Sequence, residues 1–114
     1  MKVIEGLYSN GFDSKTLDKN IKKVKRNKSV KDIYVVTMPL FGDGLLEIYS
    51  YKQLLQPYYK KRSEEITVIG IAQDKEGAQE IIVNLIQAIY DSKAKNQDVR
   101  PEEVNFDVKD FLKI

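Results

Sequence analysis

The side chains that could do chemistry in this chain are carboxylates, hydroxyls, lysines, arginines and seven tyrosines, because histidine and cysteine are both absent. Without cysteine there is no disulfide, thiolate nucleophile or zinc ribbon. Without histidine, the side chain best suited to proton transfer near neutral pH is missing, and Ser-His-Asp or Cys-His catalysis is excluded. We therefore expect a non-enzymatic protein without a cofactor and assign no catalytic residue. A small enzyme that works through tyrosine, lysine and carboxylates is kept as an alternative.

The basic residues are unevenly distributed along the chain. The net charge is +2, yet residues 15–31 hold eight bases against one acid, so this segment is +7 and the rest is −5. Such an asymmetry bears on partners rather than on fold. A second basic cluster at residues 60–62 follows two adjacent tyrosines, and aromatic rings next to bases can stack on unpaired nucleobases.

These clusters predict, as an alternative function, a nucleic-acid-binding domain whose bases neutralise phosphates. The candidate residues are Lys15, Lys19, Lys22, Lys23, Arg26, Tyr58, Tyr59, Lys60, Lys61 and Arg62. The competing interpretation is a solvated helix face whose bases balance acids elsewhere on the protein. The chain carries no RRM, KH or zinc-finger signature.

Tyrosines indicate a second candidate surface. Tyr49 and Tyr51 have the same parity in a predicted strand, so we expect both side chains on one face. Tyrosine is enriched at interfaces, and with Phe41 in the preceding loop these residues could bind a partner chain or a small ligand. The alternatives are that the tyrosines pack under a helix and that Phe41 folds back onto the core.

Phosphate and metal motifs are missing from the sequence. The glycine-containing turn at residues 6–11 continues with Phe12 and Asp13 where a P-loop needs Lys and Ser or Thr. The turn at residues 70–77 would place Asp74 and Glu76 at a helix N-terminus, where they would repel an anion. Carboxylates do not follow EF-hand spacing, so we expect no metal site.

The hydrophobic pattern predicts seven elements in the order β-α-β-β-α-β-α. The strands are expected at residues 2–8, 32–38, 45–51 and 66–72. A basic amphipathic helix begins behind Asp13 or Ser14 and ends near Asn27, and a helix over residues 52–62 is interrupted at Pro57. Asp74 caps the last helix. Residues 93–114 are expected to be a polar linker and C-terminal tail, with a possible last strand through Val104, Phe106 and Val108.

This order predicts a single α+β domain over residues 1–114, with a ferredoxin-like, mostly antiparallel single-layer sheet, two helices on one face and an extra C-terminal helix. In that topology the apolar strand at residues 66–72 lies at a sheet edge and needs a cover, so we expect a homo-oligomer, most simply a homodimer. No apolar run is long enough to span a bilayer, so we expect a cytoplasmic protein without a membrane partner. The leading functional hypothesis is a small binding or interaction module that self-associates.

Overall fold

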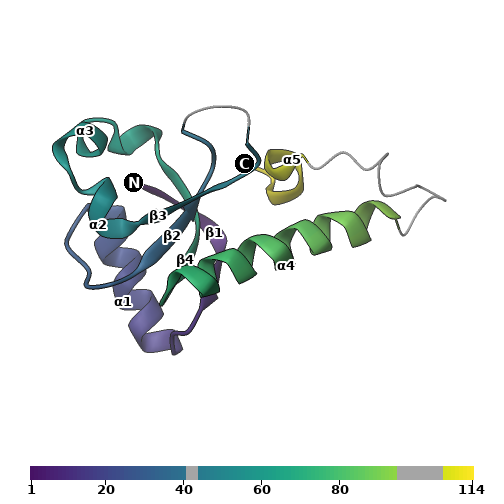
Figure 1. The fold of residues 1–114 in the computed structure, drawn as a ribbon, viewed down its shortest axis with the longest axis horizontal. Coiled ribbons are helices and arrows are strands. Elements are labelled where there is room, and N and C mark those ends of the chain that lie inside the picture. Colours follow the sequence, from purple (N-terminus) through teal and green to yellow (C-terminus); the bar gives the residue numbers. More distant parts are fainter. Residues whose placement is uncertain (41–43, 95–106) are drawn as a thin grey trace.

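A four-stranded mixed sheet organises the computed structural model, which describes residues 1–40, 44–94 and 107–114 (Figure 1). Within these residues the elements are β1 (Lys2–Asn10), α1 (Ser14–Lys25), β2 (Tyr34–Thr37), β3 (Glu47–Ser50), α2 (Tyr51–Leu54), α3 (Pro57–Lys60), the 3-10 turn η1 (Ser63–Glu65), β4 (Thr67–Ala72), α4 (Lys75–Ala94) and α5 (Val108–Leu112). The strand order is β1-β4-β2-β3. β1 runs parallel to β4, whereas the β4–β2 and β2–β3 pairs are antiparallel.

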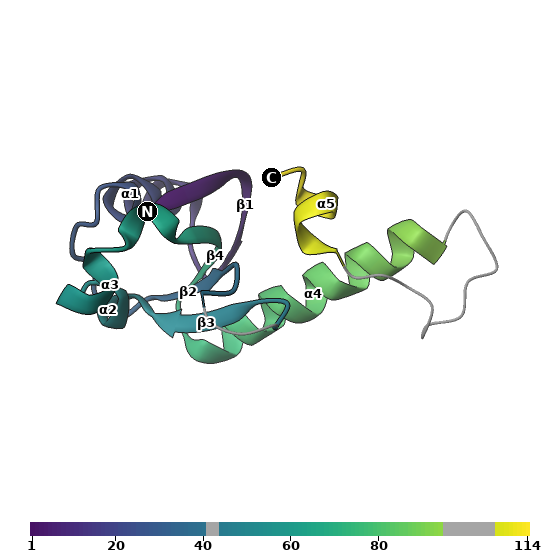
Figure 2. The same ribbon diagram turned by 90° about the horizontal axis from the view of Figure 1, so that it is seen from above.

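The sheet buries both of its faces, because successive side chains of a strand point to opposite sides. On one face Val35 and Val68 pack with Val24 of α1 and Leu54 of α2. On the other face, Val36 and Ile69 pack with Leu85 and Ile89 of α4 and with Val108 of α5. Helices therefore cover both faces, as Figure 2 shows, and the prediction of two helices on one face is wrong.

The ferredoxin-like strand order is not confirmed either. β4 lies between β1 and β2 instead of at an edge, so both of its edges are paired within the chain and it needs no second subunit to cover it. The prediction that residues 66–72 form a strand shielded on both faces is confirmed, since Val68 to Ala72 are all buried. A strand that is apolar on both faces is most stable inside a sheet, where neighbours use its backbone groups and helices cover its side chains.

The two edges of the sheet differ in regularity. β1 pairs with β4 at Val3 and again at Tyr8, but between them four residues of β1 lie opposite Ile69 alone. Gly6, in this bulge, has a φ of +72°, which a residue with a side chain rarely adopts. β3, in contrast, pairs with β2 in register at all four of its positions. The free edge of β3 is therefore regular, whereas that of β1 is interrupted.

Capping residues set the helix boundaries. The Asp13 carboxylate accepts the Thr16 N–H at 2.7 Å at the start of α1, and the Asp74 carboxylate accepts the Gly77 N–H at 2.6 Å at the start of α4. Both predicted caps are confirmed. The predicted interruption is confirmed as well, because Pro57 occupies the first position of α3, after α2 has ended at Leu54.

The C-terminal residues differ from the prediction. Val108 begins the helix α5 and does not belong to a strand, and the Asp107 carboxylate caps this helix by accepting the Asp110 N–H at 3.1 Å. Three alternating apolar residues are too few to distinguish a strand from a docked helical turn. Val104 and Phe106 lie outside the described residues. Among the helices of the described ranges, none has the length and apolar character needed to cross a membrane.

Candidate nucleic-acid interface

A row of bases runs along the solvent side of α1. The apolar residues Ile21 and Val24 pack in the core against the sheet, and Leu17 precedes Ile21 by one turn on the same side of the helix. With 3.6 residues per turn, the opposite side of the helix carries the row of Lys15, Lys19, Lys22 and Arg26, which are all exposed. The four residues are spaced by four, three and four positions, which gives a row about 16 Å long.

No carboxylate lies within ion-pair distance of these bases in the part of the chain that the structure describes. The same holds for the other bases of residues 15–31, including the half-exposed Lys23. These bases are therefore not neutralised by direct ion pairs within the described residues, although Asp18 lies one turn before Lys22 on the same helix. Part of the basic character has a local explanation, because Lys22, Lys23 and Lys25 lie in the last turn, where cations stabilise a helix.

Asn27 ends α1 and connects it to a distant segment. Its backbone is left-handed, with a φ of +56°, and the Lys28 N–H donates to the Lys23 carbonyl at 2.8 Å, as in a Schellman motif. The Asn27 side-chain oxygen accepts a hydrogen bond from the N-terminal ammonium at 2.8 Å, and its amide donates to the Ser63 hydroxyl at 3.1 Å. The predicted helix end is confirmed to within two residues, whereas nothing in the sequence indicated the contact with Ser63.

This junction brings the two basic clusters together. Ser63 directly follows Lys60, Lys61 and Arg62, so the end of α1 and the end of α3 lie at the same end of the molecule (Figures 1 and 2). The N-terminal ammonium lies between them. Its burial lowers its pKa, and the negative charge of Glu64 acts in the opposite direction.

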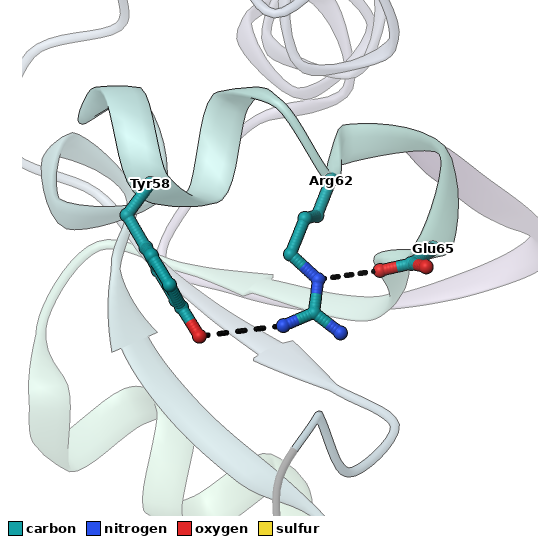
Figure 3. A network of polar contacts seen from close by, with 3 residues as sticks. All are labelled: Tyr58, Arg62 and Glu65. Carbon is teal, nitrogen blue, oxygen red and sulfur yellow. Dashed lines mark hydrogen bonds and ion pairs between the residues drawn. The ribbon is translucent and has the colours of Figure 1, made fainter.

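Arg62 is engaged by neighbouring residues of its own segment (Figure 3). Its Nε donates to the Glu65 carboxylate at 2.7 Å, and its Nη1 donates to the Tyr58 hydroxyl at 3.3 Å. The Glu65 carboxylate raises the pKa of Arg62, so the charge is retained, but it is shared with an acid. Lys60 and Lys61 are exposed and form no such pair within the described residues, which distinguishes them from Arg62.

Three of the candidate tyrosines have their rings in contact. Tyr49 and Tyr59 have centroids 5.8 Å apart, and Tyr59 meets Tyr58 edge to face at 5.1 Å. The Tyr49 hydroxyl donates to Glu47 at 3.1 Å, and burial together with this carboxylate raises the pKa of Tyr49 to about 12. The outer ring, Tyr58, has 56% of its surface exposed.

Tyr51 does not share this surface. The strand β3 ends at Ser50, so Tyr51 is the first residue of α2 and is fully buried, and its hydroxyl donates to the Lys28 carbonyl at 2.7 Å. Burial raises the pKa of Tyr51 to about 12. Tyr49 packs against the core cluster that contains Tyr51, so the two side chains lie on the same face of the sheet as the parity predicted, but Tyr51 is buried and offers no surface to a partner. Phe41 lies outside the described residues.

An open cavity of about 720 Å³ lies between β1, the start of β4 and α5. Its lining combines the apolar side chains of Ile4 and Met38 with the charged groups of Lys2, Glu65 and Lys109. Tyr49 and Tyr51, whose pKa values are raised, do not line it. Across residues 1–40, 44–94 and 107–114, no group of three or more carboxylates is placed to hold a metal ion.

Comparison of the chain with models of known protein families, with curated proteins and with solved structures found no match.

Proposed function

We propose that this chain is a small non-enzymatic binding module that binds nucleic acid through its basic surface. We define this surface as Lys15, Lys19, Lys22, Arg26, Lys60 and Lys61. The observation that carries the proposal is the exposed row of bases on α1, which forms no ion pairs within the described residues and is joined to the second cluster through Asn27 and Ser63.

The physical basis is the release of counterions. Each phosphate that a lysine or arginine neutralises frees condensed cations, and this entropy gain favours binding without any base-specific contact. A row of about 16 Å is long enough to contact several successive phosphates of one strand. The sequence contains no motif that reads bases, which agrees with binding mainly to the sugar-phosphate backbone of the nucleic acid.

The test is the salt dependence of oligonucleotide binding, measured by fluorescence anisotropy between about 50 and 200 mM salt. The triple variant Lys19→Gln, Lys22→Gln and Arg26→Gln removes three bases of the row. We expect its slope of log affinity against log salt to be smaller than that of the wild type by about 2 to 3. Glutamine is chosen because it preserves helix propensity.

A matched control removes three exposed bases that do not belong to this surface, with Lys75→Gln, Lys109→Gln and Lys113→Gln in α4 and at α5. It has the same net charge as the triple variant, and we expect it to retain the wild-type slope. Equal loss of affinity in both variants would show that binding depends only on the net charge of the protein, which would contradict binding at this surface. Undetectable binding of the wild-type protein at low salt would refute the proposal.

Self-association is a second candidate, and a different observation favours it. The free edge of β3 is regular over Glu47–Ser50, so two copies could pair β3 with β3 and continue the sheet across a two-fold axis. Sedimentation at increasing micromolar concentrations tests this. A protein that stays monomeric throughout would exclude it without affecting the nucleic-acid proposal.

A further inference from the structure

We infer that two copies of this chain associate through one continuous surface, which is made by the free edge of β3 and by an apolar flank of α4. We define this flank as Ile82, Val83, Ile86 and Tyr90. The inference deepens the self-association given above as the second candidate function and rests on it. It adds a helix surface and a register to the strand pairing.

The middle of α4 is almost without charge. Residues 79–90 contain a single charged side chain, Glu80, although 32% of the chain is charged. Glu80 accepts a hydrogen bond from the Asn10 amide of β1 at 3.2 Å. The other exposed positions of this stretch hold Gln79, Val83, Asn84 and Gln87, and Val83 has 63% of its surface exposed. An exposed helix surface depleted of charge is typical of a protein interface rather than of a solvated face.

The flank faces the β3 side of the sheet. Gly77 lies against β1, because a Cβ added there would lie 2.8 Å from the side-chain oxygen of Asn10. Ile86 follows Gly77 by nine positions, about 2.5 turns, so it lies on the opposite side of the helix, together with the rest of the flank. In the strand order β1-β4-β2-β3, the direction away from β1 leads to β3, which α4 also contacts.

The hydrogen-bonding phase of β3 leaves backbone groups at its free edge. The Tyr51 N–H donates to the Ile33 carbonyl at 3.0 Å, and alternate residues of an antiparallel strand bond to the same neighbour. The N–H groups of Ile48 and Ser50 therefore point away from β2. Within Glu47–Ser50 there is no lysine, proline or bulge of the kind that blocks edge pairing.

Antiparallel pairing centred on Ile48 uses these groups in both copies. The two Ile48 residues exchange both backbone hydrogen bonds across a two-fold axis, and the Ser50 N–H reaches the carbonyl of the partner's Leu46. Glu47 then lies opposite the partner's Tyr49. A register centred on Glu47 would place two carboxylates opposite each other, and one centred on Tyr49 would pair Glu47 with a residue outside the strand.

The same axis brings the two α4 helices together. Leu46 and Ile48 pack with the core cluster of α4, and a two-fold axis perpendicular to the sheet keeps both helices on that face. With strands about 4.8 Å apart, helices over β3 or β2 would be separated by about 5 or 14 Å, which brackets the 8–10 Å of packed helices. The flank is uncharged, so it packs against its own copy without like-charge repulsion. This self-complementarity favours a second copy as the partner.

Sedimentation of the full chain at increasing micromolar concentrations tests the α4 flank with the variant Val83→Glu. This change places carboxylates on the facing flanks of the dimer, at a position that is largely exposed in the single chain. We expect self-association to weaken by about tenfold or more. Asn84→Glu is the matched control with the same net charge, because Asn84 is exposed but does not belong to the flank. It should associate like the wild type.

Single cysteines test the register, because the wild type contains none. Ile48→Cys should form a disulfide-linked dimer under mild oxidation, since directly opposite Cα atoms in a hydrogen-bonded pair are about 5.5 Å apart. Ser50→Cys should not, because the two copies of this residue would lie roughly 13 Å apart along the strands. A mixture of Leu46→Cys and Ser50→Cys chains should form the mixed disulfide.

The outcomes separate this inference from the self-association on which it rests. A chain that stays monomeric at every concentration would overturn both and leave nucleic-acid binding unaffected. Association that Val83→Glu and Asn84→Glu weaken equally would overturn the role of the flank, while self-association would stand. Disulfide formation by Ser50→Cys as fast as by Ile48→Cys would overturn the register.

Discussion

Replacing Tyr51 with phenylalanine tests the core on the α1 face of the sheet, because it deletes one buried hydrogen bond while keeping the ring. The Tyr51 hydroxyl donates to the Lys28 carbonyl at 2.7 Å and has no exposed surface. Loss of the donor leaves this carbonyl without its partner, so we expect the variant to be less stable by about 1–2 kcal/mol at neutral pH.

The same variant should show an unusual dependence on pH. The pKa of Tyr51 is about 12 in the folded protein and 10.0 when unperturbed. Because the folded value is the higher one, the stability linked to this group is fully present below pH 10 and is lost as the pH rises through 12. At about pH 11 the wild type should have lost roughly 1.4 kcal/mol through Tyr51 alone. Tyr51→Phe lacks this group, so the gap between the two proteins should shrink nearly to zero.

Urea denaturation of both proteins at neutral pH and near pH 11 measures this gap directly. Ile71→Val, which shortens a fully buried side chain of the same core cluster, is the control. It should cost about 0.5–1.5 kcal/mol at both pH values, because no titrating group is removed. If Tyr51→Phe kept the same deficit at high pH, the reasoning from a buried, hydrogen-bonded phenol would be refuted.

Two further changes test how the elements are joined. Asn27→Ala should destabilise the protein by about 1–3 kcal/mol, because it strains a left-handed residue and deletes the side-chain bonds to the N-terminus and Ser63. Asn27→Gly should be more stable than Asn27→Ala, because glycine avoids the backbone strain, but less stable than the wild type, because it also lacks the side-chain hydrogen bonds. Equal unfolding midpoints for Asn27→Gly and the wild type would contradict a role for the side chain. Gly70→Ala should cost about 1–3 kcal/mol, since its new Cβ would lie 3.1 Å from Cγ2 of Ile81. Adding Ile81→Val, which keeps Cγ2 but deletes the Cδ1 that would lie 3.3 Å from the new Cβ, should relieve part of this cost. Strictly additive effects in a double-mutant cycle would argue against the contact.

Features that depend on neighbouring residues could be predicted from the sequence. Asp13 and Asp74 cap helices, Pro57 starts α3, and the apolar run after Glu65 forms a strand buried on both faces. Each follows from local geometry, since a cap involves residues three positions apart and burial follows the periodicity of side-chain directions. The exposure of the lysine row on α1 follows from the same periodicity.

Strand order and the meeting of distant segments were decided only by the tertiary structure. The order of elements along the chain is compatible with several sheets, and packing on both faces places β4 between β1 and β2. The Asn27–Ser63 bond joins residues 36 positions apart, and Tyr51, which was predicted on a binding surface, is buried in the core, where its hydroxyl donates to the Lys28 carbonyl. The sequence alone determined which residues are apolar, charged or able to cap. The folded chain decided which of them meet, because such contacts depend on long-range packing that no local pattern encodes.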